Sequence, residues 1–156
     1  GKALELNMVR ASLERAGELQ ATLLLIRLDS KKNIVADATL EKIRHILEHC
    51  GMETKSVEIL KGYQKGLWDL FEKTFAVSWV VPAADADAAG RVARDVEVVL
   101  ATLQQQLRKH LAYPDNAAEW FVHSGPIAGG VEARAGWRVM FAETLLRWNE
   151  QQGKNV

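Results

Sequence analysis

The sequence predicts a helix-rich α+β domain with a small mixed four-stranded sheet, a ferredoxin-like split β-α-β tendency and long flanking helices. Helix-period and strand-period apolar patterns alternate along the 156 residues. About three in five residues fall in helical patterns, well above the usual third. Residues 54–60 alternate polar and apolar, as a half-exposed strand does. The alternative is a three-layer α/β fold with a parallel sheet, because strands that alternate with helices also fit that class.

The predicted elements follow one another in a regular order. Helices are expected at 3–19, 38–50, 64–73, 85–111 and 131–151, and strands at 20–29, 54–60, 75–82 and 119–123. The first strand is apolar on both faces over its first half, which predicts a central place in the sheet. Gly51 ends the second helix, and Pro82 closes the third strand.

The length fits one domain with its own core. We expect a single globular domain over 1–156, with an N-terminal helix at 1–19, an α/β core at 20–123 and a C-terminal helix at 131–152. The first residue is Gly rather than Met, which leaves open that the chain is a piece of a longer protein.

Composition argues against several classes of protein. Twenty Lys and Arg balance twenty Asp and Glu, so the sequence offers no basic face for nucleic acid. No apolar run approaches the ~18 residues of a membrane span. A single cysteine cannot form an internal disulfide and suits a reducing compartment. We therefore expect a cytoplasmic protein with no nucleic-acid partner and no membrane span.

The second helix carries a pair of histidines beside the only cysteine. His45 and His49 are four residues apart, a spacing that can chelate a metal. A helical wheel places both on the polar side and Cys50 on the apolar side, so the three cannot share one ion. A structural zinc site also needs four ligands, which the sequence does not supply. We predict neither a metal nor a cofactor.

A glycine-rich loop before the last helix is the main candidate for ligand binding. Gly125, Gly129 and Gly130 precede a helix N-terminus, where backbone N–H groups can contact a phosphate. The spacing matches no phosphate-loop motif, and Glu132 would repel an anion. Asp29, directly after the first strand, is the acid that we would test.

The sequence shows no recognisable set of catalytic acid, base and nucleophile, so we favour a protein that is not an enzyme. Ser124 follows His123, but neighbours in sequence rarely form a nucleophile–base pair, and no nucleophile-elbow motif is present.

Residues 23–34, LLLIRLDSKKNI, resemble the first strand and following turn of diguanylate cyclase (GGDEF-type) domains. Leu28, Asp29, Lys32 and Ile34 match that pattern, whereas Arg27 stands where the family has its first metal-binding aspartate. The Gly-Gly-Asp/Glu-Glu-Phe motif is absent. This resemblance implies a catalytically inactive relative with a ferredoxin-like sheet.

The terminal helices have more apolar surface than one core requires. In the last helix one stripe contains Trp137, Phe141, Thr144 and Trp148, and a second contains Ala135, Val139, Ala142 and Leu146. In the first helix, Leu6, Val9 and Leu13 form one stripe, opposite Leu4, Met8 and Ala11. Two stripes can pack within one subunit or against another chain, and the sequence leaves both open. We assign Trp137, Phe141, Thr144, Trp148, Leu6, Val9 and Leu13 as candidate interface residues.

These observations favour a non-catalytic protein-interaction or self-association module of a larger cytoplasmic assembly or signalling protein, as a homo-oligomer or docked to other proteins. The alternative is a domain that senses a small anionic or nucleotide-like molecule between the glycine-rich loop and the sheet. A degenerate nucleotide-cyclase-like domain without activity is third.

Overall fold

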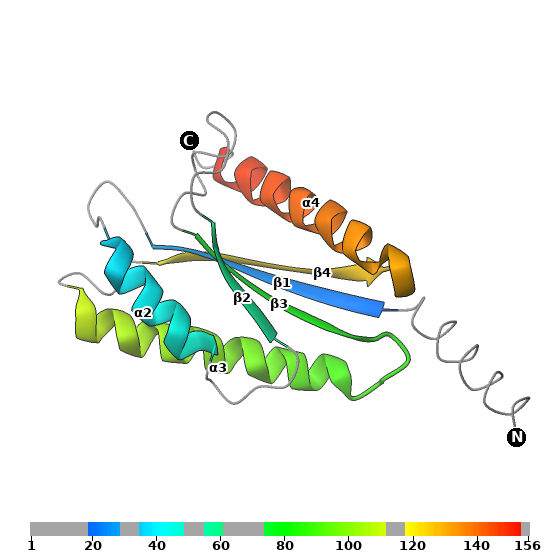
Figure 1. Cartoon of the computed structure of the whole chain (residues 1–156), viewed down its shortest axis with the longest axis horizontal. Helices are drawn as coiled ribbons and strands as arrows, with labels where there is room; N and C mark the ends of the chain where they lie inside the picture. The colour runs from blue at the N-terminus through cyan, green and yellow to red at the C-terminus, as the bar shows by residue number, and fades with distance from the viewer. Residues whose placement is uncertain (1–18, 29–34, 49–54, 61–73, 112–117, 154–156) are drawn as a thin grey trace, which may run out of the picture.

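The fold is known from a computed structural model that describes residues 19–28, 35–48, 55–60, 74–111 and 118–153 (Figure 1). Its elements are β1 (Leu19–Arg27), α2 (Asp37–Glu48), β2 (Lys55–Leu60), β3 (Thr74–Pro82), α3 (Ala88–His110), β4 (Glu119–Ile127), a 3-10 turn (Gly130–Glu132) and α4 (Ala133–Gly153). The helix predicted at 64–73 lies outside the described residues, as do Asp29, His49 and Cys50. The helix predicted at 3–19 also lies outside them except for Leu19, which is the first residue of β1 and not helical.

The strands form one sheet in the order β2-β3-β1-β4, and every hydrogen-bonded pair is antiparallel. The α+β class with helices beside the sheet is confirmed. The prediction of a mixed sheet is wrong, and so is the parallel sheet of the α/β alternative. The reason is topological: β3 lies between β1 and β2, so the two strands that α2 connects are not hydrogen-bonded neighbours.

β1 is buried on both faces, as its apolar run predicts. It lies between β3 and β4, and Leu23, Leu24, Leu25 and Ile26 are all almost fully buried. Successive side chains of a strand point to opposite faces, so a strand with no polar face needs a covering layer on each side. The helices provide both layers, with α2 and α3 on one face and α4 on the other (Figure 1).

The larger core lies between the sheet and the helices α2 and α3. Its buried apolar members are Leu24, Ile26, Leu28, Val35, Leu40, Ile43, Leu47, Phe75, Val77, Trp79, Val92, Val99, Leu103 and Leu107. The C-terminal half of α3 therefore packs in the same cluster as α2. The apolar stripe of α3, formed by Val92, Val99, Leu103 and Leu107, therefore has its packing partner within this chain.

The smaller core lies between the sheet and α4. Its members are Ala21, Leu23, Leu25, Ala76, Ile127, Met140, Phe141, Leu145 and Trp148. The helix begins close to the end of β4, because a Cβ atom placed on Gly136 would lie 3.3 Å from the Cβ atom of Ile127. Real Cβ contacts are seldom so tight, and glycine allows this approach.

β4 extends four residues beyond its predicted end at 123. Residues 124–127 were expected to be a loop because they contain Gly125 and Pro126, both typical of turns. The structure pairs this segment with β1, up to Ile127 opposite Leu19. Within the described part of the chain β4 pairs only with β1, so it is an edge strand, where proline is tolerated.

The orientation of α2 agrees with the helical wheel. Leu40, Ile43 and Leu47 are fully buried, whereas His45 and Lys42 are exposed. We expect Ile43→Ala to lower the free energy of unfolding by about 2–5 kcal/mol, because it removes a buried side chain and leaves a cavity. Lys42→Ala, on the same helix, should change it by less than about 0.5 kcal/mol. Urea unfolding measures both, and equal losses would contradict the assigned face.

Candidate functional site

The first aromatic stripe of α4 is part of the core. Trp148 is only 3% exposed, and its ring stacks on Phe121 of β4 with centroids 6.3 Å apart. Phe141 is buried and stacks on Trp137, with centroids 5.2 Å apart. The Thr144 hydroxyl, also buried, donates a hydrogen bond of 2.7 Å to the carbonyl oxygen of Met140.

This packing corrects the candidate interface. Phe141, Thr144 and Trp148 are covered by the sheet of their own chain, and the half-buried Trp137 packs against the same cluster. They fill the smaller core, so they cannot carry a contact to another chain while α4 stays on the sheet. The remaining candidates, Leu6, Val9 and Leu13, lie outside the described residues.

The second stripe of α4 is largely exposed, although Val139 also borders a cavity between α4 and β4. Val139 is 66% exposed and Leu146 is 43% exposed, and Ala135 beside them is also exposed. Val131, just before the helix, is fully exposed. We call Val131, Ala135, Val139 and Leu146 the outer stripe. The sequence had identified the last three, together with Ala142, as a second apolar stripe, but it gave no reason to choose this stripe over the aromatic one. Ala142 is half-buried and is not part of the outer stripe.

The glycine candidates are not brought together at one site. Gly125 lies within β4, opposite Ala21 of β1, and lines a small cavity of about 260 Å³ between β4 and α4. Gly129 and Gly130 do not line this cavity, and Gly130 adopts a φ of 63° at the turn into α4. Its role is therefore conformational, since this backbone region favours glycine.

A larger groove lies on the opposite face of the sheet, between α3 and β4. Its volume is about 620 Å³, within the range of ligand pockets. Its floor includes Thr22 of β1 and Ser124 of β4, whose hydroxyl groups are 2.9 Å apart and hydrogen-bonded. Trp120 is 54% exposed at the groove. Sequence reasoning missed this groove, because its two walls come from segments far apart in the chain.

An ion pair closes the turn before α3 at one end of this groove. Arg91 donates to the Asp85 carboxylate over 2.6 Å, and the same carboxylate accepts from the backbone N–H of Asp87. The bond from Arg91 is the main reason that the pKa of Asp85 lies below its usual value, although partial desolvation opposes the shift. Asp85 thus stabilises the turn rather than acting as a proton donor.

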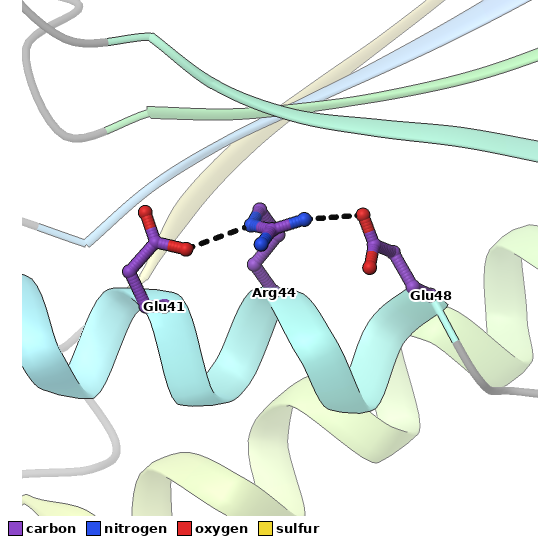
Figure 2. Close-up of polar contacts among 3 residues, drawn as sticks. All are labelled: Glu41, Arg44 and Glu48. Carbon is purple, nitrogen blue, oxygen red and sulfur yellow. Dashed lines mark hydrogen bonds and ion pairs between the residues drawn. The ribbon is translucent and has the colours of Figure 1, made fainter.

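The charges on α2 form a second ionic cluster at the surface. Arg44 lies between Glu41 and Glu48 and donates a hydrogen bond to each carboxylate (Figure 2). These bonds raise the pKa of Arg44, the one from Glu41 most strongly. All three charged side chains lie on the same side of α2, because residues three and four apart are neighbours on a helix surface. They pair with one another, so the cluster offers no reactive group.

Trp148→Ala tests whether the aromatic stripe is core. We expect a loss of about 3–5 kcal/mol in the free energy of unfolding, typical of a buried aromatic side chain. Leu146→Ala removes an apolar group from the opposite side of α4 and should cost less than about 1 kcal/mol. Thermal or urea unfolding measures both, and a larger loss at Leu146 would reverse the assignment of the stripes.

Asp85→Asn should make stability less dependent on acid pH. The folded pKa of Asp85 lies below 3.8, so its carboxylate stabilises the folded state above that pH. This contribution is lost as the pH falls through the lowered pKa. Wild type should therefore be more stable than the variant at neutral pH, and the difference should vanish in strong acid. A difference that persists in strong acid, measured by urea unfolding, would exclude this role.

No helix in the described part of the chain is long and apolar enough to cross a membrane. Within the same residues, no group of three or more His, Cys, Asp or Glu side chains could hold a metal ion. Comparisons with protein families, curated proteins and solved structures find no match to this chain.

Proposed function

We propose that the protein is a non-catalytic interaction module that self-associates through the outer stripe of α4, as part of a larger cytoplasmic assembly or signalling protein. The strand order, with β3 between β1 and β2, supports a ferredoxin-like split β-α-β scaffold for it. The observation that carries the proposal is that α4 packs one apolar stripe on the sheet and exposes another.

Exposure of this second stripe is what a contact surface requires. A helix that packs on one sheet needs a single apolar stripe, and isolated exposed apolar residues are ordinary. Here Val139 and Leu146 lie on one side of one helix, seven residues or about two turns apart. Val131, in the 3-10 turn before the helix, is a further fully exposed apolar side chain.

The size of the surface indicates a weak association. Full burial of a Val or Leu side chain contributes about 1.5–3 kcal/mol, so full burial of three such residues gives at most about 5–9 kcal/mol per subunit, before the cost of association. The outer stripe follows one helix of 21 residues, about 30 Å long. A strip of this length and a helix's width is smaller than the roughly 800 Å² per partner of a standard interface. In a two-fold dimer the outer stripe of one subunit contacts the outer stripe of the other, so both copies of this surface are buried.

The second candidate is the sensing of a small anionic molecule in the cavity between β4 and α4. Arg147 supplies a cation there, beside His123 and Gly125. Its volume of about 260 Å³ is below the usual range of ligand pockets, and Glu143 at the same cavity opposes an anion. We therefore rank it below the interaction module. A rise in melting temperature with inorganic phosphate, at unchanged mass, would favour it.

The third candidate is an inactive nucleotide-cyclase-like domain. It rests on the resemblance of residues 23–34, and Asp29 lies outside the described residues. No geometry of the described residues adds to it.

Charged substitutions in the outer stripe test self-association. We expect the wild-type protein to be dimeric or larger at micromolar concentration, and the double variant Val139→Glu, Leu146→Glu to be monomeric. Both side chains are exposed, so the helix content measured by circular dichroism should be unchanged. Analytical ultracentrifugation gives the mass.

Val98→Glu is the matched control. Val98 is 48% exposed on α3, a helix on the other face of the sheet, so this variant should associate like the wild type. A wild type that is monomeric throughout the micromolar range would refute self-association. Dissociation by Val98→Glu as well would show that added charge, rather than the outer stripe, controls the mass.

A further inference from the structure

The groove between α3 and β4 leaves part of the larger core uncovered. Val81, Val96, Leu100 and Val122 pack against that core but are only partly buried, and all four line the groove. The exposed Trp120 indole is at the same place. Large apolar side chains thus gather on one side of β4, opposite the face that α4 covers.

The groove is open because α3 presents small side chains towards β4. Ala88, Ala89 and Ala93 line it from the first turns of the helix. These side chains are short, so the space between this helix and this edge strand stays open. The groove is elongated along α3, from Ala88 to Leu100, which is the shape that another helix fits.

We propose that residues 3–17 of the same chain form an amphipathic helix that fills this groove and runs antiparallel to α3. The described part of the chain begins at Leu19, directly before Gln20, which lines the groove. Leu19 is paired with Pro82, just before the turn into α3. The start of β1 and the start of α3 therefore lie at the same end of the sheet (Figure 1). A preceding helix that folds back there enters the groove directly.

The apolar stripe of this segment fits the groove in length. Leu6, Val9, Leu13 and Ala16 have 3-4-3 spacing, and the rise from the first to the last is about 15 Å. Along α3, the groove residues from Ala89 to Leu100 span about 16 Å. The C-terminal end of this helix would lie next to Gln20, at the start of α3. In an antiparallel arrangement Leu13 then lies near Val92, Val9 near Val96, and Leu6 near Leu100.

A segment of the same chain is favoured over a second copy or another protein. Only Gly17 and Glu18 separate Ala16, the last residue of the apolar stripe, from β1, so the segment is tethered at the mouth of the groove. Such a tether gives an effective concentration in the millimolar range, above that of a free partner at micromolar concentration. Leu6, Val9 and Leu13 would then contact their own chain, and the opposite stripe with Leu4 and Met8 would face outward. This inference does not depend on self-association through α4.

Engineered disulfides test the occupant. In a Cys50→Ala background, Val9→Cys with Val96→Cys pairs one residue of the segment with one wall of the groove. The control pairs Val9→Cys with Val98→Cys, since Val98 is on α3 but does not line the groove. A disulfide requires Cα atoms within about 7 Å, so we expect an intrachain bond at least about tenfold faster in the first pair than in the control. Non-reducing gels and peptide mapping measure both.

Other outcomes would overturn the proposal. A disulfide between two chains in the Val9–Val96 pair would place a second copy in the groove. Equal rates in the two pairs, or no bond in either, would show that the segment does not occupy it.

Trp120 gives a second measurement that needs no cysteine. The fluorescence emission of Trp120 is obtained by subtracting the spectrum of the Trp120→Phe variant from that of the wild type. With the groove filled, this emission should be blue-shifted and poorly quenched by iodide in the full chain. A red-shifted, readily quenched emission would mean an open groove and would overturn the proposal even if the cysteine variants fail to fold.

Discussion

The burial of β1 on both faces is the constraint on which the rest of the structure depends. A strand that is apolar on both sides can lie only inside a sheet that is covered twice. Leu24 and Ile26 face α2 and α3, and Leu23 and Leu25 face α4, so the two cores meet back to back across this strand. The outer surface of α4 follows from this constraint, because the helix must use one stripe to cover β1.

The fold was predictable where a residue's own neighbours determine its place. The apolar run of β1 indicates a central strand, and the spacing of Leu40, Ile43 and Leu47 indicates the buried side of α2. β4 was not predictable to its end, because Gly125 and Pro126 give a local turn signal. Their pairing with Ala21 and Gln20, a contact across about a hundred residues, overrides that signal. The antiparallel sheet was missed for a related reason, since strand order depends on which strands pair.

The candidate surfaces were less predictable than the fold. Both stripes of α4 are apolar, so amphipathicity cannot show which one packs on the sheet. The choice depends on Phe121, which stacks on Trp148 from a different element. The groove depends on the alanines of α3 meeting an edge strand that follows in the chain. A run of alanines in a helix indicates high helix propensity, and it does not by itself predict an open space.

β4 connects the two proposed contacts. It has one hydrogen-bonded neighbour in the described part of the chain, so its stability depends on the layers that cover it. Phe121 supports α4 on one face, and Trp120 and Val122 line the groove on the other. A helix in the groove would bury the second face of β4 and hold β4 more firmly on β1. Phe121, which supports α4, belongs to β4. If an occupied groove stabilises β4, it also stabilises the surface on which α4 packs, and by thermodynamic linkage such a coupling is equal in both directions.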